Sequence, residues 1–317
     1  MTPSTVPPLT PAALLSHARF DVAGLVVVLA AGALYAAGVL ALRRRGTAER
    51  GCRWPLGRTL VFGLGLVAVL FATVGGLGVY ARVLFGAFTV QVLVLLVGAP
   101  LLLAAGRPLE LLRAVRRRDG RSRTEQVLAN PLLGPAALPV LTALVFFTPT
   151  LDVALREPAV GAVVRLVLLG AGLVFALPLL GDNVPRTSLA VALAAFVGFF
   201  ELLLDAVPGI VLRLHPTLLT PWFAELHRTW GPSPLVDQQN GGSILWVVAE
   251  AVDLPFLALI VLQWIRADQR EAAVIDRRLD RQLGPIEDGA EPETGRPWWE
   301  TDPTVFGSAR ADEMRRR

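Results

Sequence analysis

This sequence is poor in the side chains that most often carry redox or metal chemistry. Its 317 residues include one cysteine, Cys52, only two methionines and three histidines. A single cysteine excludes an internal disulfide, a cysteine-rich zinc site and a Cys-x-x-Cys redox motif. Met1 and Met314 cannot form the series of thioethers that would pass copper(I) along a chain of sites. No P-loop, dinucleotide fingerprint or nucleophile elbow occurs either, so the sequence indicates no enzyme class.

Lysine is absent as well, and arginine supplies all 30 basic residues and the net charge of +4. A nucleic-acid-binding surface would mix basic residues with polar and aromatic ones on a face exposed to water. Here the arginines instead cluster at the ends of apolar runs, as in Arg43-Arg44-Arg45. The charge pattern therefore predicts membrane topology and no nucleic-acid partner.

Long apolar runs are abundant. Apolar residues make up 54% of the chain against 18% charged residues, and the mean hydropathy is +0.56. About 20 apolar residues in a helix span the hydrocarbon core of a bilayer. We therefore expect an all-α, polytopic integral membrane protein in a bacterial-type plasma membrane, with seven spans at roughly 22–42, 59–78, 83–104, 131–150, 159–180, 188–205 and 243–264.

The orientation follows from the arginine count on the two sides of these spans. With the N-terminus outside, the cytoplasmic segments are 43–58, 105–130, 181–187 and 265–317. They hold 24 arginines, whereas the outer segments hold five. This asymmetry predicts an outer N-terminus and a cytoplasmic C-terminus.

The predicted spans and their orientation divide the chain into three parts. We expect an extracytoplasmic segment at 1–20, a seven-helix membrane domain at 21–265, and a charged, largely disordered cytoplasmic tail at 266–317. The connection at 206–242 is expected to lie at the membrane surface, with a re-entrant element as the alternative.

Several charged residues fall inside the predicted spans, where an isolated charge is costly. Arg165 and Glu201 lie at similar depths in the fifth and sixth spans and are expected to pair. Asp205 lies one turn from Glu201, and Glu250 and Asp253 share a face of the seventh span. Two interpretations remain open for this cluster: buried ties between helices, or a polar site that opens to the outer surface.

Histidines offer a second candidate site. His17, His215 and His227 all map to the outer side, although none has the i,i+4 spacing of a paired helical ligand. A copper site rebuilt from His215 or His227 with Asp237, and with Glu250 as a further ligand, is one hypothesis. Ordinary loop histidines are the other.

The stretch from Trp230 to the end of the seventh span carries a distinctive run of residues. It contains Trp230, Asp237, Gln238, Gly241, Gly242 and Trp246, followed by Glu250, Asp253-Leu-Pro255, Gln263-Trp264 and Asp276-Arg277-Arg278. This run resembles the CtaG-like cytochrome c oxidase assembly family. The resemblance implies a seven-helix membrane protein that matures haem-copper oxidases through copper delivery on the outer side.

The third span follows the same family frame through Gln91, Pro100, Gly106 and Pro108 but departs from it at the metal ligands. Where the family carries two His-Met pairs, this chain has Phe88-Thr89 and Val92-Leu93. In the fifth span, Arg165 stands where family members place histidine, ahead of the matching Gly172 and Pro178. Phe and Val have no donor atom for copper, and an arginine does not deprotonate.

The sequence therefore favours a non-enzymatic oxidase assembly factor that acts as a scaffold or in a divergent form of copper delivery. Its expected partners are the lipid bilayer, oxidase subunits and copper chaperones, with copper itself only a possible ligand. Two alternatives remain: a copper-binding or copper-transporting protein with a rebuilt outer site, and a proton- or ion-coupled carrier that uses the intramembrane carboxylates.

Overall fold

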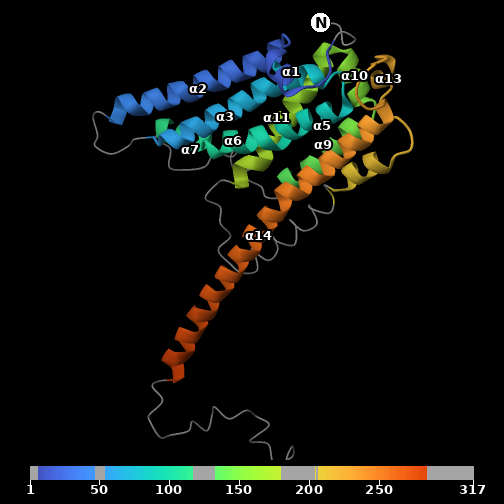
Figure 1. The fold of residues 1–317 in the computed structure, drawn as a ribbon. Helices are drawn as coiled ribbons and strands as arrows, with labels where there is room; N and C mark the ends of the chain where they lie inside the picture. The colour runs from blue at the N-terminus through green and yellow to red at the C-terminus, as the bar shows by residue number, and fades with distance from the viewer. Residues whose placement is uncertain (1–5, 47–53, 117–132, 180–203, 205, 284–317) are drawn as a thin grey trace, which may run out of the picture. The chain divides into compact units, whose positions relative to one another are not determined.

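The computed structural model describes residues 6–46, 54–116, 133–179, 204 and 206–283, and every regular element among them is a helix (Figure 1). The all-α prediction is confirmed. The elements are α1 (Pro11–Ser16), α2 (Val22–Gly46), α3 (Leu56–Thr73), α4 (Gly76–Tyr80), α5 (Phe85–Leu93), the π-helical turn η2 (Val94–Gly98), α6 (Ala99–Ala105), α7 (Pro108–Arg116), α9 (Leu133–Phe147), α10 (Thr150–Arg156), α11 (Pro158–Leu179), α13 (Trp222–Glu225) and α14 (Pro234–Leu283).

The described helices include four that are long and apolar enough to cross a membrane. These are Val22–Arg44, Leu56–Tyr80, Phe85–Arg116 and Pro158–Leu177, which correspond to the predicted first, second, third and fifth spans. A fifth is added if Leu138–Phe147 and Thr150–Arg156, bent by 68° at their junction, count as one broken span. The protein is therefore a multi-pass membrane protein, while the total of seven and the orientation stay predictions.

The remaining predictions are tested to different degrees. Of the predicted span at 188–205, only residue 204 is described, and it is helical. Of the tail expected at 266–317, residues 266–283 belong to α14 and are helical, while 284–317 lie outside the described residues. The span at 243–264 lies within α14, which is helical throughout. Contacts divide the chain into two units, 1–262 and 263–317, and the described part of the second unit is the end of α14. The connection at 206–242 contains helical residues 206–214 and the short α13.

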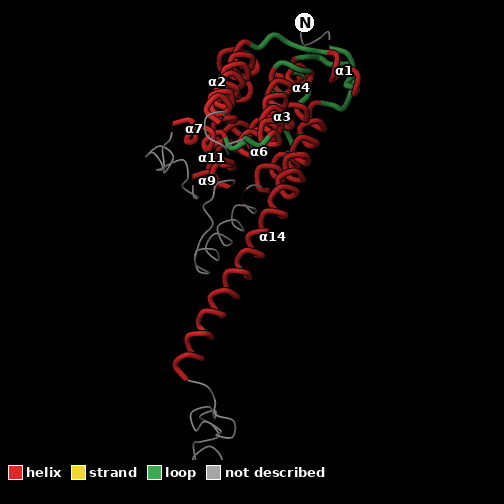
Figure 2. Tube along the Cα trace, turned by 90° about the vertical axis from the view of Figure 1, so that its left-hand side faces the viewer, coloured by secondary structure: helices red, strands yellow, loops and turns green. Residues whose placement is uncertain are grey.

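The third span is the centre of the larger unit. Its elements η2 and α6 pack between α3 on one side and α11 on the other, while α2 lies on α3 and α9 lies on α11 (Figures 1 and 2). In its most apolar stretch 61% of the residues are buried, against 17% in the first span. A helix that is apolar on all sides suits both places, because protein or lipid can cover each face.

Pro100 accounts for the irregular turn within this central span. It lies near the start of α6, directly after the π-helical turn η2. Proline has no amide hydrogen and its ring crowds the carbonyl of the preceding turn, so a local departure from α-helical geometry accommodates it. Gly172 of α11 packs against this π-helical turn and Pro100. A Cβ atom at Gly172 would lie 2.5 Å from Pro100 Cγ and would also strike the Leu96 carbonyl oxygen. The glycine thus allows α11 to approach the irregular turn closely.

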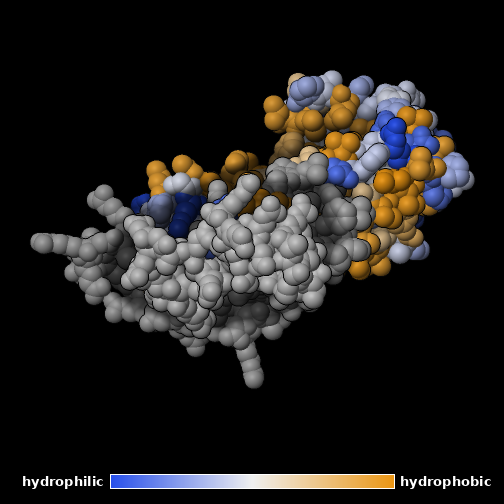
Figure 3. Space-filling model, turned by 90° about the horizontal axis from the view of Figure 1, so that it is seen from below, coloured by the Kyte–Doolittle hydropathy of each residue, from blue (hydrophilic) through white to orange (hydrophobic). Residues whose placement is uncertain are grey.

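The outer faces of α2 and α3 carry large apolar side chains that the rest of the described protein leaves exposed. Apolar side chains are also prominent on the face drawn in Figure 3, where described residues are visible. On a soluble protein such patches are rare, and lipid is the environment that accounts for them here. The most exposed on these two helices are Val22, Val26, Leu29, Leu34, Leu56, Leu60, Leu64 and Val67.

The N-terminal segment packs against the end of the bundle where α2 and α5 begin. The Tyr80 hydroxyl donates to the Pro7 carbonyl at 3.0 Å, and the Trp230 indole N–H donates to the Val6 carbonyl at 3.0 Å. Val6 and Tyr80 belong to one buried cluster with residues from α1 and α4. These contacts fix the segment before α2 against α4 and Trp230.

Candidate functional site

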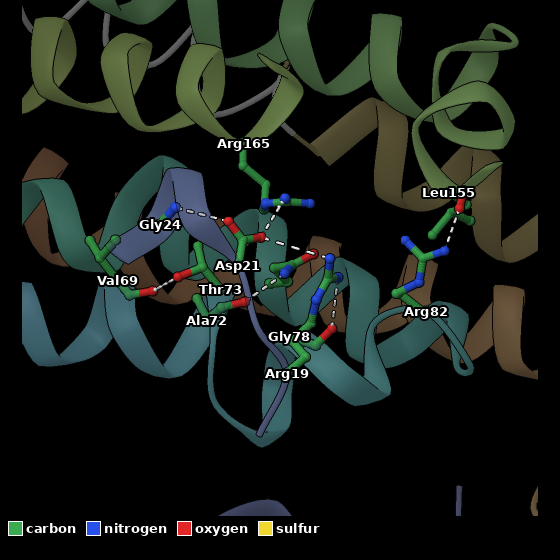
Figure 4. Close-up of polar contacts among 11 residues, drawn as sticks. Arg19, Asp21, Gly24, Val69, Ala72, Thr73, Gly78, Arg82, Leu155 and Arg165 are labelled. Carbon is green, nitrogen blue, oxygen red and sulfur yellow. Dashed lines mark hydrogen bonds and ion pairs between the residues drawn. The ribbon is translucent and has the colours of Figure 1, made fainter. Parts of the chain in front are cut away.

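Arg165 and Asp21 form a buried ion pair at this end of the bundle. Arg165 extends from α11 toward Asp21 at the start of α2, and its Nη2 donates to Asp21 Oδ2 at 2.5 Å (Figure 4). Asp21 Oδ1 accepts a hydrogen bond from the Gly24 amide at 2.8 Å, and the carboxylate side chain is 3% exposed. A carboxylate in this position caps the helix and suits the positive end of its dipole.

Glu201, the partner expected for Arg165, lies outside the described residues, as does Asp205, and that pairing stays a prediction. Asp21 is a partner that the sequence analysis missed. The signal was available, because an aspartate directly before an apolar run is typical of a helix N-cap.

Two further arginines approach the same place. Arg19 Nη2 lies 3.8 Å from Asp21 Oδ2, and Arg19 Nη1 donates to the Gly78 carbonyl at 3.5 Å. Arg82, in the turn between α4 and α5, donates from Nη2 to the Leu155 carbonyl at 2.6 Å. Burial lowers the pKa of Arg82, and repulsion from the charges of Arg19 and Arg165 lowers it further. Within the described part of the chain, Asp21 is the one carboxylate at ion-pair distance from any of these three arginines.

The three arginines line a small cavity together with Phe88 and Gln91 of α5. Its volume of about 20 Å³ accommodates about one water molecule. The Gln91 side-chain amide nitrogen donates to the Ala72 carbonyl at 2.5 Å. We call this site the arginine cavity, and it brings Phe88, Gln91 and Arg165 together.

Phe88 and Val92 lie one turn apart on α5 and are both buried in the core. The Phe88 ring packs edge-on against Phe146, with ring centroids 5.8 Å apart. Apolar packing therefore fills the i,i+4 positions at which, by the resemblance, family members place paired histidines.

These side chains do not fit a copper ion. The arginine cavity presents guanidinium groups, an amide and an aromatic ring, none of which is a copper ligand of ordinary proteins. Among the described residues, no group of three or more His, Cys, Asp or Glu side chains is placed to hold a metal. The Nδ1 atoms of His215 and His227 instead lie at 2.9 Å from the Thr217 carbonyl and 2.7 Å from the Glu225 carbonyl.

Asp237, which the copper-site hypothesis combined with His215 or His227, instead binds the backbone of a neighbouring helix. Its carboxylate accepts hydrogen bonds from the Phe85 amide at 2.8 Å and the Gly86 amide at 3.2 Å, which are the first amides of α5. Burial raises the pKa of Asp237, although these amides and Arg228, whose Nη2 lies 3.7 Å away, act in the opposite direction. Asp237 thus joins the start of α14 to the start of the third span.

The neighbouring motif residues Gln238, Gly241 and Gly242 also hold helices together. Gln238 accepts from the Leu219 amide at 2.8 Å and donates to the Thr217 carbonyl at 3.1 Å, which fixes the turn before α13. A Cβ atom at Gly241 would lie 2.6 Å from the Phe85 ring, and one at Gly242 would lie 2.7 Å from the Gly209 carbonyl oxygen. Only glycine permits these close approaches.

The remaining candidates on α14 lie apart from the arginine cavity. Trp246 donates from its indole nitrogen to Glu250 Oε1 at 3.3 Å, one turn along the helix, and neither residue lines the cavity. The side chain of Asp253 lies outside the described residues. Of the predicted polar cluster, Gln91 and Arg165 therefore lie together at the cavity, and Glu250 lies elsewhere. Arg19, Asp21 and Arg82, which were not among the predicted residues, lie beside Arg165.

Fold and site together define a multi-pass helical membrane protein that holds partly buried arginines at one end of its bundle. Residues 33–267, most of the chain, match the family of the cytochrome c oxidase caa3 assembly factor (Caa3_CtaG), and the chain belongs to that family. The resemblance expected from the motif at 230–246 is confirmed.

The chain is also similar to uncharacterised mycobacterial proteins. One from Mycobacterium bovis and one from Mycobacterium tuberculosis are each 29% identical over 298 residues, covering 86% of this chain and 43% of the relative. One from Mycobacterium leprae is 26% identical over 288 residues, covering 83% of this chain and 41% of the relative. The chain thus spans less than half the length of these relatives. No solved structure matches it.

Proposed function

We propose that this protein acts as a non-catalytic membrane scaffold in the maturation of a haem-copper oxidase, without holding copper at the third-span position. Membership of the caa3 assembly family supports the oxidase part of the proposal. The observation that supports the rest is the chemistry of the arginine cavity, where Phe88 packs as a core residue and Arg165 extends toward Asp21.

The positive charge of the arginine cavity is a second reason, besides the lack of ligands, why copper would not bind there. Three guanidinium groups converge on the cavity and one described carboxylate faces them, so an incoming copper cation would meet net positive charge. A copper(I) site needs soft sulfur or imidazole donors to offset such repulsion. Arg165 supplies a fixed cation where the family resemblance implies a bound one.

A scaffold needs surfaces that partner membrane proteins can contact. Among helices in lipid, close packing and hydrogen bonds between helices drive association, because the lipid is as apolar as the helix surfaces. The exposed apolar faces of α2 and α3 offer such surfaces to oxidase subunits. The protein would then position a subunit during assembly and take no part in the transfer chemistry.

Copper content per chain, measured on the full-length protein purified in detergent, tests the absence of a copper site. We expect wild type to hold well below one copper(I) per chain, and the combined change Phe88→His with Val92→His to raise binding, most strongly when Arg165→His is added. Phe88→His alone is the control, because one imidazole cannot chelate. One tightly bound copper in wild type that survives loss of His215 and His227 would show that the proposal is wrong.

A deletion strain tests the scaffold role itself. We expect loss of assembled oxidase, measured by its haem absorbance and activity, that added copper does not restore. Restoration by copper would assign the protein a role in metal supply and contradict the scaffold proposal.

A further inference from the structure

Two arginines stack on the same tryptophan and differ in how their charge is neutralised. The guanidinium carbons of Arg82 and Arg156 lie 5.5 Å and 5.6 Å from the centroid of the Trp222 ring. Arg156 is bound by two carboxylates, Asp152 at 2.6 Å and Glu225 at 2.7 Å. Arg82 faces the arginine cavity, and its described partners are the Leu155 carbonyl and the indole ring.

The arginine cavity therefore carries excess positive charge among the described residues. Arg19, Arg82 and Arg165 contribute three charges, and Asp21 neutralises one of them. Partly buried charges in a low-dielectric surrounding are costly without a counterion, and like charges add to that cost. An arginine also has five N–H donors, so each of the three can bind more acceptors than it meets here.

The cavity lies near the ends of membrane spans, where the phosphate groups of lipids are located. Arg19 and Arg82 lie in the connections just outside the candidate spans Val22–Arg44, Leu56–Tyr80 and Phe85–Arg116. Residues at the ends of spans lie at the depth of lipid headgroups. A cavity with room for about one water molecule admits one oxygen atom of an anionic group, while the rest of that group stays at the open side.

We propose that the arginine cavity binds a phosphate group, with Arg82 as the main ligand and Arg19 and Arg165 as supporting cations. Guanidinium groups match phosphate oxygens in shape and charge, and such charge-assisted hydrogen bonds are among the strongest in proteins. The phosphate belongs to a lipid headgroup or to a free anion. The proposal goes beyond the scaffold function and does not depend on it, since copper content and phosphate binding are measured separately.

The test is ligand-induced stabilisation of the full chain in a neutral maltoside detergent. Thermal unfolding is followed with added phosphatidylglycerol, with zwitterionic phosphatidylcholine, and with inorganic phosphate against chloride at equal ionic strength. We expect phosphatidylglycerol to raise the unfolding midpoint more than phosphatidylcholine does, because it neutralises the site. Stabilisation by inorganic phosphate as well would identify a free anion as a second ligand.

Matched variants separate this site from general attraction to anionic lipid. Arg82→Gln should weaken phosphatidylglycerol binding by about tenfold or more, since it removes a charge-assisted contact. Arg156→Gln, which removes an arginine from the same tryptophan, should leave the affinity unchanged. Arg82→Lys should retain part of it, and this variant serves if Arg82→Gln does not fold.

Three outcomes would overturn the proposal. A wild-type unfolding midpoint that neither lipid nor inorganic phosphate changes would show that there is no phosphate site. If the Arg82 and Arg156 variants lose equal amounts of phosphatidylglycerol affinity, the binding would reflect general surface charge and not this cavity. Binding that appears only after Glu201→Gln and Asp205→Asn would show that the protein's own carboxylates already neutralise the cavity.

Discussion

Asp21 serves two groups with its two oxygens. Oδ1 caps α2 through the Gly24 amide, while Oδ2 binds Arg165 of α11. Because the carboxylate is almost wholly buried, its charge is stabilised by the helix amides and the guanidinium group and hardly at all by water. One side chain thus ties the start of the first span to the fifth span.

Breaking this pair from one side should destabilise the protein more than breaking both sides. Asp21→Asn keeps an acceptor for the Gly24 amide but removes the charge, and we expect a loss of about 3 kcal/mol, typical of an orphaned partner in a buried pair. Arg165→Gln should cost a similar amount, and the double variant should cost less than either single variant. Unfolding in detergent at increasing denaturant measures these differences.

The control for this prediction is Arg156→Gln, which breaks an exposed ion pair and should change stability little. If Asp21→Asn and Arg165→Gln each leave the unfolding midpoint at its wild-type value, the buried pair does not contribute to stability.

At the scale of elements, the contact between α11 and the π-helical turn of the third span decides how the core packs. The π-helical turn before Pro100 leaves an irregular surface, and Gly172 lets α11 approach it. Asp237 and Gly241 bring α14 close to α5, and Gly242 brings it close to helical residues 206–214. The motif at 230–246 is therefore explained by helix packing, because its described side chains contact the backbone and side chains of neighbouring elements.

Gly172→Ala should destabilise the bundle by about 1–3 kcal/mol, the usual cost of overpacking a close contact. Its Cβ would press on Pro100 and the Leu96 carbonyl, and the backbone cannot yield easily. Gly170→Ala is the matched control, since no atom lies within 4 Å of the Cβ it would add. The control should be neutral or slightly stabilising, as alanine favours helix. Equal unfolding midpoints for the two variants would contradict the close packing of α11.

At the scale of the whole molecule, the arginine asymmetry predicts which side of the membrane each end occupies. Reporter fusions after Arg45, after Arg118 and at the C-terminus should behave as cytoplasmic, and one near Pro232 as external. With that predicted orientation, the arginine cavity would face the outer side. An external signal from the C-terminal fusion would contradict the seven-span count, and a cytoplasmic signal near Pro232 would reverse the side of the cavity.

The sequence by itself determined the helical membrane class, four of the spans and the family. Hydropathy and loop charge report on contact with lipid and water, and these depend on each segment alone. The motif at 230–246 identified the family from residue types and spacing alone. Arg165 was recognisable as a costly intramembrane charge that needs a partner.

Only the tertiary structure decided what the charged residues face. Asp21 and Arg165 are separated by 144 positions, and no local pattern states that α2 and α11 place them 2.5 Å apart. Arg19 and Arg82 counted in the sequence merely as two outer arginines, yet packing of α4, α5 and α11 brings them to one cavity with Gln91. Periodicity defines the faces of single helices, whereas a site made from several helices depends on how those faces meet.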